Sequence, residues 1–559
     1  MTGVDPLVAL AAADKARDLG ERPTWIRLFA DDEIASWAEL AGDGALAGVP
    51  FAVKDNIDVQ GVPTTAAWPG RDKPAEASAT AVGRLVGAGA IPIGKTNLDQ
   101  FATGLVGSRS PYGAVPAVGY PDRISGGSSS GSAVAVASGL VPLALGSDTA
   151  GSGRVPAGFN GLVGVKATRG LISTSGVLPA CRSLDCVTTL TRTVGEARAA
   201  LNVLIGHDAT DPWSRARPPL PPSRIAREMN VLAVPAGAID LDPSYADAWA
   251  RTLDRARQDW QIVEVDIEPF LAAARLLYDG PWVAERYAAV GHLLDSDHGS
   301  LDPTVRSIIR RGRDLSAADA FRGFDALRAL CAEVDPMWDY VDALLLPTTP
   351  NHPTLAEVAA DPVGANARLG TYTNFVNLMD LGAIAVPGEP VADGRPFGVQ
   401  LIAPAFADDA LLDLAAAWCG EPVADTSPRP AAQVVVCGAH LTGMPMNVQL
   451  LRLGARLVRR TRTGPGYRMF ALPDGRRPGL IAASGGPERG IDVEVWELSD
   501  ASIGELLRSI APPLGLGTVV LADGSGVTGF VAEATRLDDA KEITEYGGWR
   551  RYIAGDAKP

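Results

Sequence analysis

The chain has 559 residues, of which 47% are hydrophobic and 21% are charged. This much apolar material supports a packed core and excludes a disordered chain, and the length predicts two or more domains. Lys and Arg number 50 against 65 Asp and Glu, and the formal net charge of −15 argues against nucleic acids and anionic membranes as partners.

Targeting and redox features favour the cytoplasm. The first twenty residues lack the basic-then-apolar plan of a signal peptide, and the longest apolar run, residues 132–146, is too short to span a membrane. We interpret that run as a buried core segment. The five cysteines, few and odd in number, disfavour a disulfide framework and favour a reducing compartment.

The hydrophobic pattern changes near residue 425. Before it, β-branched runs such as 50–54, 91–94 and 344–347 alternate with Ala-rich helical stretches such as 79–89, which predicts an α/β fold with a mixed central sheet flanked by helices. We therefore expect a first domain over 1–425, a proline-rich linker over 426–433 and a smaller β-rich α+β domain over 434–559. The strand-like segments of the second domain are 433–436, 467–471, 493–498, 518–521 and 529–531.

Two Gly/Ser-rich turns, at residues 126–131 and 146–153, enclose an apolar segment. Small residues let the backbone approach a ligand closely, and a serine after such a turn can lie among N–H groups that stabilise an oxyanion. The apolar filling argues against a flexible Gly/Ser linker. The stretch therefore indicates a site for a reactive serine.

Lys54 follows the apolar run Pro50–Val53 and is expected at the end of a buried strand. Burial disfavours the charged amine, so the pKa of Lys54 should fall below the ordinary value of about 10.4, and a neutral amine can act as a general base. The alternative is an ordinary lysine at a strand exit, paired with Asp55 or Asp58.

Together these segments resemble the amidase signature family. GGSSSG followed by GSDTAGSGRVPA is close to that family's long Gly/Ser signature, and the resemblance covers most of residues 45–405. Further segments follow in the family's usual order: VKDNID, GKTNLDQFATG, FNGLVGVKAT, LLLPTTP, TNFVNLMDLGAIAVP and PFGVQLIAP. The resemblance implies the amidase-signature fold and a Ser–cis-Ser–Lys triad, with no metal and no cofactor. In that triad Ser152 is the nucleophile, Ser128 the bridging serine after a cis peptide bond, and Lys54 the base.

The resemblance also implies an oxyanion hole formed by the backbone N–H groups of Thr149, Ala150, Gly151 and Ser152. The family usually has glycine where Ala150 stands and an aliphatic residue where Gly153 stands. Both departures leave the backbone donors in place, so they concern the shape of the loop and not the chemistry.

Residues 278–287, YDGPWVAERY, carry a narrower resemblance. Tyr278 and Arg286, together with TGLVGSRSPYG and ACRSLD, are similar to allophanate hydrolases within the family. An arginine fork suits a planar carboxylate and a phenol can hydrogen-bond an amide, as a carboxylated urea requires. The alternative is a core tyrosine and an arginine in an ordinary ion pair. Gln100 is a further candidate for contact with the substrate.

Residues 437–472 resemble the C-terminal domain of allophanate hydrolases, which is similar in type to the γ-glutamyl-cyclotransferase-like fold. This resemblance implies decarboxylation of N-carboxycarbamate, with His440 as the catalytic candidate. Asn447 and the arginines at the start of this domain are candidate anion holders; these are Arg452, Arg456, Arg459, Arg460, Arg462 and Arg468. The alternative is a histidine in a turn beside a solvated basic face.

The resemblance as a whole implies hydrolysis of allophanate to ammonia and carbon dioxide, in the degradation of urea or cyanuric acid. A urea carboxylase is then the expected pathway partner, and a homodimer the expected assembly. The nearest alternative is another amidase, such as the amidotransferase component that supplies ammonia to misacylated tRNA. A catalytically inactive scaffold is a second alternative, which intact Lys54, Ser128 and Ser152 disfavour.

Two other motif matches are weaker. GAIPIGKT at 89–96 fits the phosphate-loop pattern, but its apolar interior contains a proline where that loop needs free N–H groups. GSSSG at 127–131 fits a nucleophile elbow centred on Ser129, which needs an acid and a histidine downstream. The spacing of the five histidines matches no zinc motif.

Overall fold

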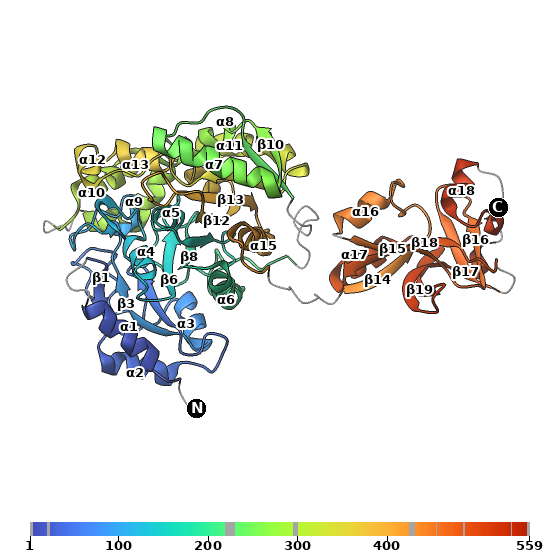
Figure 1. The fold of residues 1–559 in the computed structure, drawn as a ribbon, viewed down its shortest axis with the longest axis horizontal. Coiled ribbons are helices and arrows are strands. Elements are labelled where there is room, and N and C mark those ends of the chain that lie inside the picture. Colours follow the sequence, from blue (N-terminus) through green and yellow to red (C-terminus); the bar gives the residue numbers. More distant parts are fainter. Residues whose placement is uncertain are drawn as a thin grey trace. The chain divides into compact units, whose positions relative to one another are not determined.

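The computed structural model describes residues 4–18, 23–218, 230–294, 300–423, 431–453, 455–483, 487–537 and 539–555. The chain forms two compact units, the first containing residues 4–217 and 230–423 and the second containing residues 431–555 (Figure 1). The first strand of the second unit begins at Ala431, inside the expected linker, and residues 426–430 of that linker lie outside the described residues.

An eleven-stranded mixed sheet forms the centre of the first unit, as the alternating sequence predicts. The strands, in spatial order, are β1 (Trp25–Leu28), β3 (Ile91–Thr96), β2 (Pro50–Lys54), β6 (Leu143–Asp148), β8 (Cys186–Thr191), β7 (Val163–Lys166), β12 (Leu381–Pro387), β13 (Gly398–Pro404), β11 (Ala343–Pro347), β9 (Val231–Pro235) and β10 (Gln261–Val265). Most are short apolar runs buried on both faces, because helices cover both sides of the sheet. A separate hairpin pairs β4 (Pro116–Ala117) with β5 (Tyr120–Ile124).

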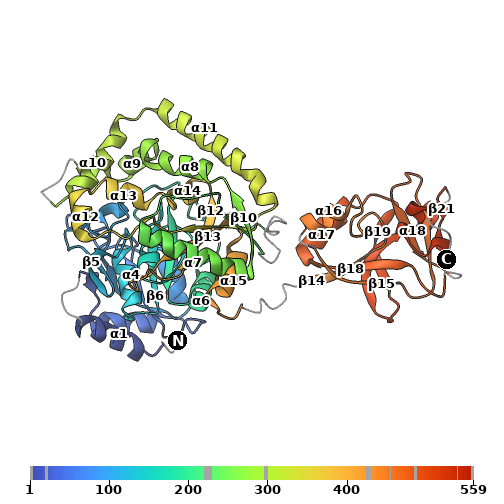
Figure 2. The ribbon, with the colours of Figure 1, turned by 45° about the horizontal axis from the view of Figure 1, so that its top comes forward.

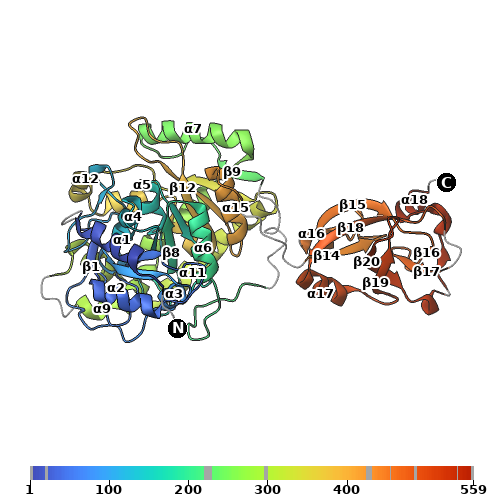
Figure 3. The ribbon, with the colours of Figure 1, turned by 60° about the horizontal axis from the view of Figure 1, so that its bottom comes forward.

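The helices of the first unit are α1 (Leu7–Asp18), α2 (Asp31–Leu40), α3 (Thr80–Gly87), α4 (Ser130–Ala137), α5 (Arg154–Phe159), α6 (Val194–Leu204), α7 (Pro243–Asp259), α8 (Glu268–Asp279), α9 (Trp282–Leu294), α10 (Pro303–Arg311), α11 (Ala317–Val334), α12 (Leu355–Ala360), α13 (Gly364–Leu369), α14 (Asn374–Leu378) and α15 (Asp408–Cys419). Helix α8 packs against α9, α11 and α14 (Figure 2). Helices α6 and α15 pack against each other beside the sheet (Figure 3).

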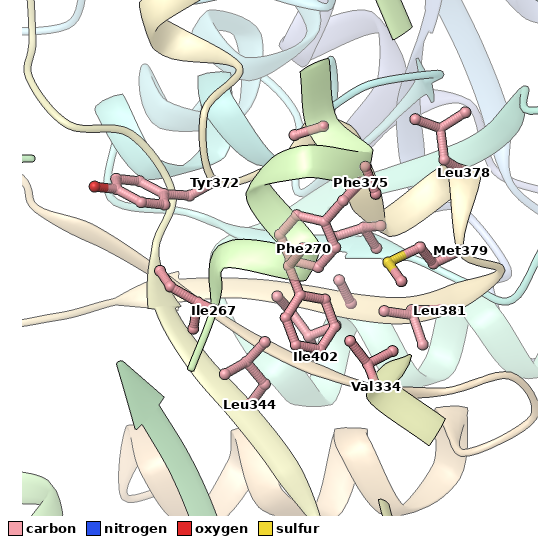
Figure 4. Packing of buried hydrophobic residues seen from close by; sticks show 14 of the residues in the cluster. Ile267, Phe270, Val334, Leu344, Tyr372, Phe375, Leu378, Met379, Leu381 and Ile402 are labelled. Atoms are coloured by element: carbon pink, nitrogen blue, oxygen red, sulfur yellow. The ribbon is translucent and has the colours of Figure 1, made fainter. Parts of the chain in front are cut away.

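The largest hydrophobic cluster of the first unit joins these outer helices to the sheet. Phe270 of α8 meets Phe375 of α14 with ring centroids 5.1 Å apart, above Leu381 of β12 and Ile402 of β13 (Figure 4). Ala150 belongs to the same cluster. The loop after β6 therefore packs against the core, unlike a flexible linker.

Strand direction brings the chemistry-bearing segments of the first unit together. Strand β2 runs parallel to β6, with Phe51 opposite Leu143 and Val53 opposite Leu145, so the carboxyl ends of both strands lie side by side. Lys54 ends the first of these strands, and Ser147 lies near the end of the second. Helix α4 begins at Ser130, immediately after Ser128 and Ser129, so the two serines of the turn lie at its amino end.

The described residues of the second unit form a β-rich α+β structure, as predicted. Its five-stranded sheet has the order β15 (Arg456–Arg462), β18 (Asp492–Ser499), β14 (Ala431–Val436), β20 (Gly526–Ala532) and β19 (Leu514–Val520). A three-stranded sheet contains β17 (Pro478–Ala482), β16 (Tyr467–Ala471) and β21 (Lys541–Glu542), and the helices are α16 (Asn447–Arg452), α17 (Asp500–Ser509) and α18 (Trp549–Ala554). The pattern missed β15, because its arginine-rich sequence lacks the apolar alternation that marks a strand.

Candidate active site

Lys54 is fully buried, and its amine lies among hydroxyl groups. Lys54 Nζ is 2.8 Å from Ser128 Oγ, 2.9 Å from Ser129 Oγ and 2.8 Å from Ser147 Oγ. Burial lowers the pKa of Lys54 to about 7, although the more distant carboxylates of Asp99, Asp148 and Asp185 oppose the shift. The predicted direction of the shift thus agrees with the geometry, and a large share of the amine is neutral near pH 7.

The alternative role for Lys54, an ion pair with Asp55 or Asp58, is wrong, because the described residues place only hydroxyl and carbonyl oxygens around its amine. Asp55 Oδ1 lies 2.8 Å from the Nζ of Lys95, and both side chains are buried. Lys95 lies on β3, in the GKT segment that matched the phosphate-loop pattern. Residues 91–96 therefore form a buried strand with a paired lysine, so the nucleotide interpretation is wrong as well.

The peptide bond between Gly127 and Ser128 is cis, as the resemblance implies. Ser152 is almost fully buried, its Oγ lies 3.4 Å from the carbonyl oxygen of Gly104, and its own carbonyl accepts the N–H of Ser129 at 3.2 Å. Among the described residues no hydrogen bond joins the hydroxyls of Ser128 and Ser152. The structure thus contains the Lys54–Ser128 contact, while proton transfer between Ser128 and Ser152 stays a prediction.

A buried ion pair shapes the loop that carries Ser152. Asp148 at the end of β6 accepts the N–H groups of Gly151 and Gly153 at 2.8 and 3.1 Å and binds Arg154 Nε at 3.0 Å. Burial alone would raise the pKa of Asp148, but Arg154 and the backbone donors hold it at about 2. The carboxylate therefore stays charged and fixes the turn.

Gly151 is removed from the expected oxyanion donors, because its N–H already donates to Asp148. Its φ of 121°, and a Cβ that would lie 2.4 Å from Thr373 Oγ1, explain why glycine stands there. Thr149, Ala150 and Ser152 stay the predicted donors.

Arg286 on α9 is 3% exposed, and its positive charge contributes to the lowered pKa of Lys54. Its Nη1 donates to Thr103 Oγ1 at 3.2 Å, and its guanidinium lies 5.8 Å from the ring centroid of Tyr278. No carboxylate of the described residues forms an ion pair with it. The ordinary ion pair considered for Arg286 is therefore absent among the described residues.

Gln100 has a structural role that its position in the motif does not reveal. Its Nε2 donates to the carbonyls of Ala67 at 2.8 Å and Ser300 at 3.0 Å, and its Oε1 accepts the N–H of Asp302 at 2.9 Å. All of its amide hydrogen-bonding groups are thereby engaged in joining loops. We withdraw Gln100 as a candidate for substrate contact.

Three residues that the sequence interpretation missed support the site. Ser147 binds Lys54, and Asp185 accepts the Thr149 hydroxyl at 2.5 Å. Glu285, next to Arg286, accepts the N–H and hydroxyl of Ser183, both at 2.7 Å, and so fixes α9 to the 181–185 loop. These residues could have been selected from the sequence, because each is a charged or hydroxyl residue within an otherwise apolar or glycine-rich segment.

Ser129 does not fit the nucleophile elbow. Its hydroxyl donates to the carbonyl of Ser147 at 3.1 Å and lies 2.9 Å from Lys54 Nζ, and among the described residues it contacts no histidine. It therefore helps to surround the lysine, and the histidine-dependent mechanism lacks its base.

In the second unit, His440 lines a cavity of about 190 Å³ with Gln449, Arg477, Ser509 and Phe530. Its Nε2 is 2.9 Å from Gln449 Oε1, and its ring stacks on Phe530 with centroids 4.9 Å apart. Burial lowers the pKa of His440. The shift favours the neutral ring, and the contacts with Gln449 and Phe530 fix its orientation.

Of the predicted anion holders whose side chains are described, none lines the His440 cavity. Asn447 uses its side-chain amide to bind the carbonyl of His440 at 3.0 Å, and so positions the backbone. Four of the candidate arginines bind carboxylates: Arg459 binds Asp523, Arg460 binds Glu494, Arg462 binds Asp492 and Arg468 binds Glu542. The arginine in the His440 cavity is Arg477, which the sequence interpretation did not select.

All five cysteines are free thiols. No helix among the described residues combines the length and the apolar character that a bilayer crossing requires. The same residues contain no group of three His, Cys, Asp or Glu side chains placed to hold a metal ion.

Comparison with known proteins defines the class first. Residues 11–412 match the Amidase family, and the chain belongs to it. Residues 432–554 match the allophanate hydrolase C-terminal domain.

Particular relatives cover both units. The solved structure of Kluyveromyces lactis allophanate hydrolase is 37% identical with a TM-score of 0.75, covering 98% of this chain and 97% of that one. The urea amidolyase of Lachancea kluyveri is 41% identical over 95% of this chain, which spans 31% of that relative's length. A glutamyl-tRNA(Gln) amidotransferase component of Lacticaseibacillus paracasei is 36% identical, covering 68% of this chain and 85% of that relative.

The buried carboxylate of Asp185 provides a test of the Lys54 environment. Its charge favours the ammonium form of Lys54, so Asp185→Asn should lower the pKa of that lysine further. If neutral Lys54 activates Ser152, labelling of Ser152 by a fluorophosphonate rises with pH through the pKa of Lys54, near 7, and this rise should move to lower pH in the variant.

Asp208→Asn is the matched control, because Asp208 binds Thr80, Ser173 and Thr210 and touches neither Lys54 nor Thr149. A labelling profile that stays in place in Asp185→Asn, or moves to higher pH, would show that Asp185 does not act on the base.

Proposed function

We propose that the first unit hydrolyses the amide of allophanate, the carboxylated form of urea, through an acyl-enzyme on Ser152. The observation that carries the proposal is Arg286, a buried guanidinium with no carboxylate partner among the described residues. A buried cation is costly unless an anion pairs with it, so a substrate that brings its own carboxylate stabilises the site. The match to an allophanate hydrolase structure over both units supports the same substrate.

The proposed chemistry starts at Lys54. The neutral amine takes the proton of the Ser128 hydroxyl, which takes the proton of Ser152, and Ser152 Oγ attacks the terminal amide carbon of allophanate. The N–H groups of Thr149, Ala150 and Ser152 hold the oxyanion. The relay returns the proton to the leaving nitrogen, the C–N bond breaks, and ammonia departs. Water then cleaves the ester and leaves N-carboxycarbamate, a dianion.

We further propose that the second unit decarboxylates this dianion in the His440 cavity. Breaking the bond between carbon and nitrogen requires a proton at the nitrogen, and a neutral, oriented imidazole can relay one at pH 7. Arg477 lines the same cavity; its Nε binds Asp474, and its terminal nitrogens suit a further carboxylate. The products are carbon dioxide and carbamate, which decays to ammonia.

The proposal places this protein after a biotin-dependent urea carboxylase, since carboxylation of urea produces allophanate. The relative from Lachancea kluyveri is named for urea, and this chain matches less than a third of it, which is consistent with a carboxylating part elsewhere. We also propose a homodimer in a reducing cytoplasm, where five free thiols persist. An amidotransferase role is less favoured, because the amidotransferase relative aligns with 68% of this chain, whereas the allophanate hydrolase structure aligns with 98%.

Ser152→Ala should reduce ammonia release from allophanate by at least about 10³-fold, because it removes the atom that becomes acylated. Ammonium formation with purified protein measures this, with circular dichroism to confirm folding. Ser130→Ala, one residue beyond the serines that bind Lys54, is the control and should retain activity. Substantial ammonia release by Ser152→Ala would exclude the acyl-enzyme mechanism.

Arg286→Gln should reduce kcat/KM for allophanate by about 10- to 100-fold, the loss of one charge-assisted hydrogen-bond pair, and should change hydrolysis of the uncharged acetamide far less. Steady-state kinetics with both amides measure the ratio. Arg275→Gln on the exposed face of α8 is the matched control. Equal slowing with both amides would contradict a carboxylate clamp.

His440→Gln should leave prompt ammonia release from allophanate intact but slow carbon dioxide release to the rate in buffer. Parallel assays of ammonium and of carbon dioxide separate the two steps, and His207→Gln at an exposed position is the control. Unchanged carbon dioxide release would exclude His440 from decarboxylation, without affecting the proposal for the first unit.

A further inference from the structure

A second cavity of the C-terminal unit, of about 340 Å³, is rich in arginine and lies apart from the His440 cavity. We call it the arginine groove. Its charged lining residues are Arg460, Arg462, Asp492, Glu494, Arg550 and Arg551. None of them lines the His440 cavity.

Strand register builds the floor of the arginine groove. Arg460 of β15 lies opposite Glu494 of β18, and Arg462 lies opposite Asp492, so four charged side chains alternate on one face of the pair. Arg460 Nε is 3.1 Å from Glu494 Oε1, and Arg462 Nε is 2.7 Å from Asp492 Oδ1.

Helix α18 adds two more arginines to the same two carboxylates. Arg550 Nη2 is 3.1 Å from Glu494 Oε1, and Arg551 Nη2 is 2.8 Å from Asp492 Oδ2. Each carboxylate therefore faces two guanidinium groups. Other pairs among the described residues of this unit join one arginine to one carboxylate, such as Arg459 with Asp523 and Arg477 with Asp474. Positive charge is in excess in the arginine groove, with four guanidinium groups against two carboxylates.

Glu494 has no further capacity to balance that charge. Burial favours its neutral form, but the N–H and hydroxyl of Thr442, Arg460 and the Trp496 indole together lower its pKa. Its Oε2 accepts the Thr442 N–H at 2.7 Å, the Thr442 hydroxyl at 2.9 Å and the indole N–H at 3.2 Å. The carboxylate is ionised and already committed to the protein.

The arginines keep donors for a ligand. In the described part of the chain, Arg460 and Arg462 bind their carboxylates through Nε alone, which leaves their terminal nitrogens for another acceptor. Side chains of the four arginines are 35–65% exposed, so a solute can reach them. A guanidinium fork matches the paired oxygens of a phosphate or a carboxylate.

We propose that the arginine groove binds a small oxyanion with two negative charges, of the phosphate or short dicarboxylate class. Two charges on the ligand balance the two guanidinium groups in excess. The proposal is independent of the function proposed above. The groove also touches the loop that carries His440, because Arg550 donates to the Thr442 carbonyl and Glu494 holds the Thr442 N–H.

Isothermal titration of the full chain with inorganic phosphate, and separately with malonate, tests the proposal at constant ionic strength in chloride. Arg462→Gln and Arg551→Gln should each weaken binding about tenfold or more, the loss of one charge-assisted hydrogen bond. Each variant leaves Asp492 with its other arginine, so the fold keeps that contact. Arg468→Gln is the matched control, since Arg468 pairs with Glu542 and does not line the groove.

Binding that is lost in both groove variants and kept in Arg468→Gln supports the site, and the tighter of the two anions identifies the ligand class. Absence of binding by both anions at millimolar concentration would overturn the proposal. So would binding that Arg462→Gln and Arg551→Gln leave unchanged but Arg286→Gln or Arg477→Gln removes, because the anion would then occupy one of the other two sites.

Discussion

The central constraint on the first unit is the burial of one amine that contacts no carboxylate among the described residues. Lys54 Nζ has three hydroxyl oxygens within 2.9 Å, and these groups hydrogen-bond equally well to an amine or an ammonium. Because no hydroxyl holds the charged form as a carboxylate would, burial dominates and the pKa falls to about 7. An ion pair at the same depth would have kept the lysine charged and unable to accept a proton.

The fold serves this constraint through two parallel strands and one helix. The adjacent carboxyl ends of β2 and β6 supply Lys54 and Ser147, and the turn before α4 supplies Ser128 and Ser129. The charged groups nearby form ion pairs with each other and do not contact the Lys54 amine: Asp148 pairs with Arg154, and Asp55 pairs with Lys95. Those pairs fix the surrounding loops, while the contacts of Lys54 with the described residues are all to neutral groups.

The features that could be predicted from the sequence are those that short contiguous motifs determine. The strand ending at Lys54, the direction of its pKa shift and the β-rich second unit follow from contiguous segments, and the cis peptide before Ser128 follows from the family resemblance; the structure agrees with all four. The role of Gln100 could not be predicted, because two of its partners lie about 200 residues away in the chain.

The same limit applies to the arginines of the second unit. Their crowding in the sequence indicated an anion site near His440, but strand pairing brings Arg460 and Arg462 to carboxylates on β18, and Arg459 and Arg468 bind carboxylates elsewhere in the unit. Likewise, the wording around Gly151 gives no sign that Asp148 takes its N–H. In both cases the role of the residue depends on a partner that only the tertiary structure brings close.

Strand β15 has a consequence for behaviour at high concentration. It forms one edge of the five-stranded sheet, and an edge offers unpaired N–H and C=O groups to any strand that approaches. Arg459, Arg460 and Arg462 crowd that edge with bulky, hydrated charge. The border of the sheet thereby discourages templated growth between neighbouring molecules, a protection against amyloid-like association that an apolar border would lack.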